Sequence, residues 1–186
     1  METRESTIRK VYVFRGRVLT IRNDDALMPN GDVRNREVVE HPGGVCVLPI
    51  LEDGTVLLVE QFRYPYMEDV LEAPAGKLEP GEDPFEAARR ELREETGMVA
   101  ETYYDLGWDY PSPGYTNEII RLYAATGLSD VGQQLDEDEF LNIRKVPFEE
   151  LLELIYDNKV RDSKTAMAAL KYKDLKALNK LEEKKL

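Results

Sequence analysis

Acidic side chains recur one helical turn apart in residues 84–96, a segment whose pattern predicts an α-helix. Glu91 and Glu95 are four residues apart and Glu94 lies beside them, so a helix brings three carboxylates to one side of one turn. Like charges at this spacing destabilise an isolated helix by about 0.2–0.5 kcal/mol per pair. Arginines between these acids, such as Arg90, would reduce the repulsion by forming salt bridges, as in a salt-bridged surface helix. Mg²⁺ would also reduce it, because it prefers oxygen ligands and can be shared by such carboxylates.

Both ends of this helix are marked in the sequence. Asp83 is a good N-cap, Pro84 suits the first helical position, and Glu86 at the third completes an acidic capping box. Gly97 is placed to end the helix in the left-handed conformation. The apolar stripe expected to face the core is Phe85, Ala88 and Leu92.

The spacing of the longer segment 76–98 adds to this local pattern. Its defined positions are Gly76, Glu82, Arg90, Glu91, Leu92, Glu94, Glu95, Gly97 and Met98. These nine positions over 23 residues resemble the Nudix box at every point. A phosphate-binding P-loop does not fit residues 74–81, which lack its glycine spacing and the Ser or Thr after the Lys.

The resemblance implies a loop–helix–loop that binds metal, with Mg²⁺ as cofactor and Mn²⁺ as a substitute, and a diphosphate. The metal ligands that it implies are Glu91, Glu95 and the carbonyl of Ala75. Glu94 is implied as a further ligand or as a base. The residues implied to hold the loop are Gly76, Glu82 and Arg90.

Motifs outside the box extend the resemblance to the bacterial ADP-ribose pyrophosphatases. They are residues 40–44 (EHPGG), 59–65 (VEQFRYP), 72–77 (EAPAGK), 112–114 (SPG), 136–140 (DEDEF) and 162–165 (DSKT). Some of these motifs are shared with hydrolases of other nucleoside diphosphate sugars, so this likeness favours ADP-ribose without excluding a related substrate.

The same likeness assigns three residues to the substrate. Arg63 would contact the diphosphate, since a planar guanidinium binds phosphate oxygens in bidentate fashion. Arg36 would reach the ligand from the N-terminal sheet of a neighbouring subunit, and Glu118 would touch the terminal ribose or a metal. The alternative for Arg63 is a strand-end arginine in solvent, and for Arg36 the ligand and solvent alternatives are nearly even.

The acidic segment 136–139 carries the last candidates. Four consecutive acids usually form a solvated charge run, but the resemblance makes Glu137 the base that takes a proton from the attacking water. Glu139 would be a metal ligand. Glu94 remains the rival base, and the sequence leaves this choice open.

Composition excludes several other classes of function. The net charge of −12, from 25 basic and 37 acidic side chains, argues against binding nucleic acid or an anionic membrane. A single cysteine, Cys46, and a single histidine, His41, exclude an internal disulfide and a zinc site of the usual kind. The chain starts without a signal-peptide pattern and has no apolar run of about 18 residues. A cytoplasmic location is therefore expected.

The remaining pattern predicts how these residues are positioned. Strands are expected in residues 8–22, 33–40, 45–51, 55–61, 70–73, 119–125 and 140–146, and helices in 84–96, 148–157 and from 164 onward. The tail 181–186 is expected to be frayed and solvated. This order favours an α/β (mixed α+β) fold with a mixed sheet and helices on both faces. The resemblance makes it a Nudix α/β/α sandwich.

Two domains are expected. Residues 1–41 would form a small antiparallel sheet that dimerises the protein, and residues 42–186 would form the Nudix hydrolase domain. Such a sheet is too small to be stable alone, and the family likeness implies a homodimer.

Three hypotheses for function follow from the sequence. The first is Mg²⁺-dependent hydrolysis of ADP-ribose to AMP and ribose 5-phosphate. The second is hydrolysis of another nucleoside diphosphate sugar or of a dinucleotide. The third, disfavoured by the complete box, is a non-catalytic module that binds nucleotides.

Overall fold

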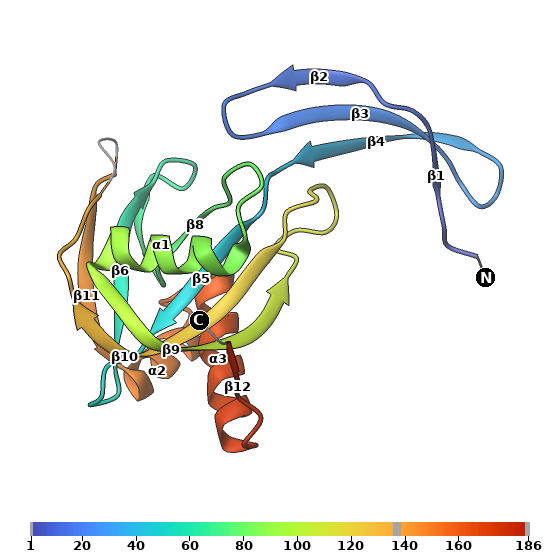
Figure 1. Cartoon of the computed structure of the whole chain (residues 1–186). Helices are drawn as coiled ribbons and strands as arrows, with labels where there is room; N and C mark the ends of the chain where they lie inside the picture. Colours follow the sequence, from blue (N-terminus) through green and yellow to red (C-terminus); the bar gives the residue numbers. More distant parts are fainter. Residues whose placement is uncertain (1, 136–138, 185–186) are drawn as a thin grey trace. The chain divides into compact units, whose positions relative to one another are not determined.

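The computed structural model describes residues 2–135 and 139–184, so the candidate base Glu137 lies outside the described residues. The chain divides into two compact units. The first contains Met1–Gly43 and Tyr110–Ile119, and the second contains Gly44–Asp109 and Ile120–Leu186. Figure 1 shows the strands and helices of both.

The first unit is built on a four-stranded antiparallel sheet. Its strands are β1 (Ser6–Arg9), β2 (Tyr12–Arg15), β3 (Thr20–Leu27) and β4 (Val33–Glu40). Both β1 and β2 pair with β3, and β4 pairs with β3 along its full length. Gly31, with φ of 86°, makes the tight turn before β4 that glycine allows. The predicted N-terminal antiparallel sheet is confirmed.

The second unit contains a mixed sheet of five strands in the order β12-β9-β10-β5-β8. These strands are β12 (Glu182–Lys184), β9 (Met98–Asp109), β10 (Ile120–Asp130), β5 (Gly44–Pro49) and β8 (Ala75–Lys77). The pair β5–β10 is parallel, and the others are antiparallel. The predicted mixed sheet is confirmed.

A second, antiparallel sheet of three strands has the order β11-β6-β7. It consists of β11 (Leu141–Pro147), β6 (Thr55–Arg63) and β7 (Glu68–Glu72). The hairpin of β6 and β7 pairs Arg63 with Glu68 and Val59 with Glu72. The carboxyl ends of β6 and β7 carry Arg63 and Glu72, which become important at the site.

Helices cover both faces of β5. The helices are α1 (Pro84–Thr96), α2 (Phe148–Tyr156) and α3 (Ser163–Ala177). Side chains alternate along a strand, so Val45 and Val47 pack with α1 in one apolar cluster. Cys46 and Leu48 pack with α2 and α3 in another. The predicted sandwich is therefore confirmed, as Figure 1 shows with α1 and α3 on opposite sides of the sheet.

Cys46 is a core residue, as its apolar neighbours in the sequence suggested. Its side chain is fully buried, and burial raises the pKa of the thiol well above its ordinary value. Such a thiol is an apolar filler of the core and a poor nucleophile. Among the helices of the described chain, none is long and apolar enough to span a bilayer.

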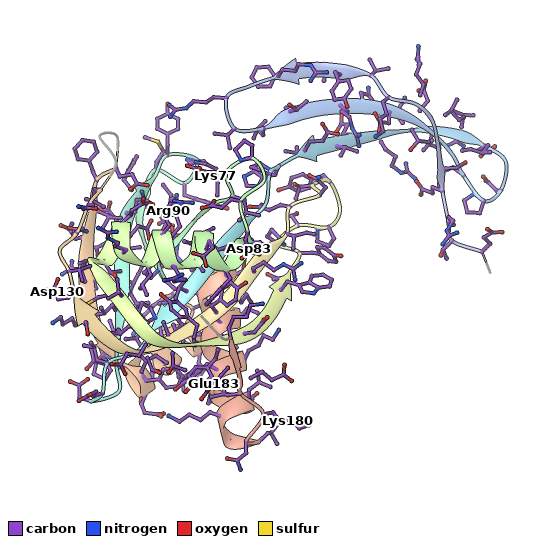
Figure 2. The ribbon with its side chains drawn as sticks, viewed as in Figure 1. Lys77, Asp83, Arg90, Asp130, Lys180 and Glu183 are labelled. Carbon is purple, nitrogen blue, oxygen red and sulfur yellow. The ribbon has the colours of Figure 1, made fainter. Side chains whose placement is uncertain are left out.

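The expectation of a frayed tail was wrong for Glu182–Lys184, although their side chains are exposed as expected. Glu182–Lys184 forms β12, which pairs with residues Tyr103 to Asp105 of β9. Leu181 packs against the core. The tail therefore covers the edge of the five-stranded sheet, and exposed edges are sites of association between chains. Figure 2 labels Glu183 on this strand.

A chain that ends after Lys180 is expected to be less stable by about 1 kcal/mol, because Leu181 is removed from the core. It should also associate through the uncovered edge of β9. Thermal unfolding and light scattering measure both effects. The control Glu183→Gln keeps the strand and should behave as wild type, whereas unchanged stability of the shortened chain would contradict a supporting role for β12.

Candidate active site

The helix α1 begins and ends where its caps predict. Asp83 accepts hydrogen bonds from the backbone N–H groups of Phe85 (2.9 Å) and Glu86 (3.3 Å). At the other end, Gly97 has φ of 73° and its N–H donates to the carbonyl of Arg93. The stripe of Phe85, Ala88 and Leu92 is buried. Fixed ends and a buried stripe set the rotation of the helix and thus the direction of its carboxylates.

Two of these carboxylates are buried. Glu91 is 7% exposed and Glu95 is 3% exposed. The N–H of Ala75 donates to Oε2 of Glu95 (3.0 Å). Burial raises the pKa of both carboxyls, that of Glu95 to about 8, and the negative charge of Glu139 raises both further. Two buried carboxylates thus lie on one side of α1, with the charge of Glu139 within electrostatic reach of both.

Gly76 makes room for one of them. A β-carbon on Gly76 would lie 1.8 Å from Oε1 and 1.9 Å from Cδ of Glu91. The carboxylate of Glu91 therefore rests directly against the backbone of β8, where only glycine leaves space for it. This contact explains in physical terms why the loop before the helix needs a glycine at this position.

Arg90 gathers the other acids of the box. Its Nε and Nη2 donate to the two oxygens of Glu82 (2.9 and 3.0 Å). Its Nη1 donates to Glu91 (2.7 Å) and Glu94 (2.9 Å). The bond to Glu82 is the largest cause of a raised pKa for Arg90. Figure 2 shows Arg90 extending from α1 toward Lys77, whose carbonyl accepts a further bond at 3.3 Å.

The Arg90→Met variant is expected to lose about 3 kcal/mol of unfolding free energy, because three acidic groups lose their shared partner. The matched control is Arg89→Met, since Arg89 pairs with Glu86 on the exposed side of the same helix. That pair should contribute less than about 0.5 kcal/mol. Urea unfolding of both variants checks the difference, and equal losses would contradict the role of Arg90.

Arg63 lies at the end of β6, and its guanidinium is held by Glu72. Its Nε and Nη2 donate to the two oxygens of Glu72 (2.6 and 2.8 Å). The bond to Glu72 is the largest cause of a raised pKa for Arg63, and the charge of Glu95 also contributes. The guanidinium is therefore within electrostatic reach of the buried carboxylates. Sequence reasoning quoted Glu72 within a motif but gave it no role.

A loop that leads to the acidic segment is anchored to the end of α1. The N–H of Val131 donates to the carbonyl of Gly97 (2.8 Å), and that of Gln134 donates to the carbonyl of Glu94 (3.1 Å). The side chain of Gln133 donates to the carbonyl of Glu95 (2.5 Å). These bonds use carbonyls that a helix end leaves unpaired. Sequence reasoning missed this anchor, because its signal is only a Gln-Gln pair before the acids.

The donor set fits a hard divalent cation. Glu91 and Glu95 supply buried oxygens, Gly76 leaves the space they occupy, and Glu139 adds its negative charge. No three Asp, Glu, His or Cys side chains in the described ranges are already arranged around one point. Repulsion among carboxylates keeps them apart, and a cation is the group that would draw them together.

Two candidate residues belong to the first unit. Arg36, on β4, donates from Nε and Nη2 to the carboxylate of Glu5 (2.8 and 2.7 Å). Glu118 lies 3.3 Å from Nδ1 of His41, and the N–H of His41 donates to Asn117. Both residues therefore have local partners within that unit, and their assignment to a ligand stays a prediction.

The chain is similar to two characterised relatives over nearly its whole length. The ADP-ribose pyrophosphatase of Bacillus subtilis (strain 168) is 42% identical over 174 residues, which cover 92% of this chain and 94% of that protein. The methanol dehydrogenase activator of Bacillus methanolicus is 44% identical over 166 residues, which cover 88% of this chain and 90% of that protein.

A solved structure has the same fold. The crystal structure of an ADP compounds hydrolase matches with a TM-score of 0.82 and 25% sequence identity, covering 95% of this chain and 96% of that chain. The family model for the NUDIX domain matches residues 40–168, more than half of the chain. The family model and the relatives together show that the chain belongs to the Nudix family.

Proposed function

We propose that this protein is a Mg²⁺-dependent hydrolase that cleaves ADP-ribose to AMP and ribose 5-phosphate. The observation that carries the proposal is the pair of buried carboxylates, with Glu91 seated against Gly76 and Glu95 within electrostatic reach of Arg63. Carboxylates that are shielded from water favour the binding of a divalent cation. A bound cation in turn attracts the negatively charged diphosphate. Similarity to an ADP-ribose pyrophosphatase along both chains favours ADP-ribose among the diphosphates.

The reaction adds one water across the diphosphate. Oxygen of the water bonds to one phosphorus, the bond from that phosphorus to the bridging oxygen breaks, and the bridging oxygen leaves with the other phosphate. Divalent ions supply charge neutralisation of the phosphate oxygens and activation of water. Glu91, Glu95, the carbonyl of Ala75 and Glu139 are the proposed ligands, and Arg63 would bind and orient the phosphates.

A base must take a proton from the water. Glu137 and Glu94 are the two candidates. Glu94 already accepts a bond from Arg90 (2.9 Å), which occupies one of its oxygens. Glu94→Gln and Glu137→Gln kinetics separate them, because loss of a general base costs roughly 10²–10⁴-fold in rate.

A homodimer is part of the proposal. The four-stranded sheet exposes more than half of several large apolar side chains, namely Ile8, Val13, Phe14 and Val33. A small sheet with so much exposed apolar surface is expected to pack against a partner. Sedimentation equilibrium tests this state, and a stable, active monomer would refute it.

The substrate is tested with a hydrolysis screen. ADP-ribose, ADP-glucose, GDP-mannose and diadenosine polyphosphates are each assayed with Mg²⁺ and with EDTA, and products are identified by chromatography. We expect the highest kcat/KM for ADP-ribose and no turnover in EDTA. A higher kcat/KM for another compound would make that compound the assigned substrate instead of ADP-ribose. Binding of these compounds without hydrolysis of any of them would contradict the assignment as an enzyme.

Likeness to a methanol dehydrogenase activator favours a second candidate, in which the chain acts on a partner dehydrogenase. Addition of the protein to a methanol dehydrogenase assay tests this. Activation that survives Glu95→Gln would favour a role independent of hydrolysis, whereas activation lost with Glu95→Gln would make hydrolysis the cause.

A further inference from the structure

Four charged side chains meet at the N-terminal end of α3. We call them the α3 cluster: Arg63, Glu72, Asp162 and Lys164. Glu72 is almost fully buried and accepts both Nε and Nη2 of Arg63 (2.6 and 2.8 Å). It also accepts from Nζ of Lys164, which donates in addition to Asp162 (2.8 Å). Glu72 thus joins two cations that come from different elements.

The cluster continues to the loop before α1. Asp162 accepts from the N–H of Thr165 (2.9 Å) and from its hydroxyl (2.5 Å). The hydroxyl oxygen of Thr165 in turn accepts from the N–H of Ala73 (2.7 Å). Two residues later, the N–H of Ala75 donates to Glu95 (3.0 Å). One network therefore connects Arg63 with the backbone beside the proposed metal ligands.

The geometry leaves one edge of Arg63 for a ligand. Its Nε and Nη2 are turned to Glu72, whereas Nη1 makes no hydrogen bond to the part of the chain that the structure describes. The side chain is 39% exposed, but that of Glu72 is only 3% exposed. The buried carboxylate of Glu72 thus fixes the orientation of the partly exposed guanidinium of Arg63. An arginine held in this way is preorganised to bind phosphate.

Lys164 changes the net charge around the ion pair of Arg63 and Glu72. A carboxylate paired with Arg63 alone would cancel most of the positive field that attracts a phosphate. Glu72 is shared with Lys164, which also pairs with Asp162, so the four side chains of the cluster sum to zero charge, whereas without Lys164 they would carry one negative charge. The side chain of Lys164 is only 13% exposed, so water screens this effect weakly. The N-terminus of α3, which Asp162 caps, adds about half a positive charge.

Packing alone gives a poor account of the cluster. Buried ion pairs contribute little net stability compared with apolar side chains of the same volume. We propose that Lys164 is a positioning residue of the diphosphate site, which acts through Glu72 to orient Arg63 and preserve its charge for the substrate. This inference rests on the proposed function, and it adds a role for a residue that touches neither substrate nor metal.

A double-mutant cycle tests this route of action. Lys164→Met is made in the wild type and in Arg63→Ala, and kcat and KM for ADP-ribose are measured with Mg²⁺. We expect Lys164→Met to lower kcat/KM about tenfold in the wild type, mainly through KM, but less than about twofold in Arg63→Ala. The matched control is Lys173→Met, since Lys173 lies on the exposed side of α3 and bonds Tyr156.

The outcomes separate the inference from the proposed function. Equal losses in both backgrounds would show that Lys164 does not act through Arg63 and would overturn the inference. An inactive wild type would overturn the proposed function and this inference with it. If Lys164→Met does not fold, Lys164→Gln replaces it in the double-mutant cycle. Glutamine keeps a hydrogen-bond donor for Glu72 but removes the positive charge. Lys173→Met should keep wild-type kcat/KM in both backgrounds.

Discussion

The Glu95→Gln variant is expected to lose hydrolysis of ADP-ribose by about 10³-fold in kcat, since bound metal contributes several kcal/mol and about 1.4 kcal/mol is a factor of ten. The substitution keeps the shape of the side chain and an oxygen that can accept the N–H of Ala75. It removes the negative charge that binds a cation. Steady-state kinetics over a range of Mg²⁺ concentrations measures the loss, and near-normal kcat would remove Glu95 from the proposed ligands.

The stability of the same variant serves as its control. Burial raises the pKa of Glu95 from 4.5 to about 8, so without metal the folded state holds this proton more tightly than the unfolded chain. The stability that this group contributes is present below about pH 4.5 and is lost as the pH rises through 8. Metal-free wild type should therefore lose stability over this window, and Glu95→Gln should lose less. Mg²⁺ should stabilise the wild type only.

The Gly76→Ala variant is expected to separate activity from stability. Its β-carbon would overlap the carboxylate of Glu91, which must move away from β8. The end of a glutamate side chain moves easily, so unfolding free energy should fall by only about 1–3 kcal/mol. The displaced ligand should lower kcat by about 10²-fold, because small errors in position are costly in catalysis.

A glycine remote from the site provides the matched control. Gly54 lies in the turn before β6, at the opposite end of that strand from Arg63, and a β-carbon there meets no atom within 4 Å. Its φ of 83° makes alanine strained, so Gly54→Ala should cost about 1 kcal/mol of stability and leave kcat unchanged. If Gly76→Ala kept wild-type kcat, the seat of Glu91 on the glycine would have no part in catalysis.

Elements with strong local signals were predictable from the sequence. The helix α1 has the predicted bounds because Asp83 and Pro84 fix its start and Gly97 fixes its end. The strand β4 was also found with its observed bounds, since a tight turn at Gly31 marks its start. In each case the determinant is a residue whose own backbone preference sets the boundary.

Elements that depend on distant partners were missed. The strand β8 has only three residues, too few for a pattern, and it forms because Gly76 pairs with Val45. The long strand β9 contains Gly107 with φ of 84°, next to an irregularity in its pairing with β10. The tail strand β12 exists only because it finds β9 about eighty residues earlier. Local propensity does not encode such pairing.

The candidate site likewise contains residues placed by local sequence and residues placed by distant partners. Glu91, Glu94, Glu95 and Arg90 lie on one helix, so their proximity follows from helical geometry. The partnership of Glu72 with Lys164 joins positions 92 residues apart. The anchor from Gln133 to the carbonyl of Glu95 spans 38 residues. Only the tertiary fold brings these groups together, which is why the motifs containing Glu72 and Lys164 gave those residues no role and Gln133 was missed.

Crystals grown with Mn²⁺ and a non-hydrolysable ADP-ribose analogue test the central claim most directly. The anomalous signal of manganese locates each ion independently of the protein density. We predict ions bound by Glu91, Glu95 and the carbonyl of Ala75, in contact with the diphosphate. Diphosphate bound elsewhere, with these carboxylates free of metal, would contradict the account.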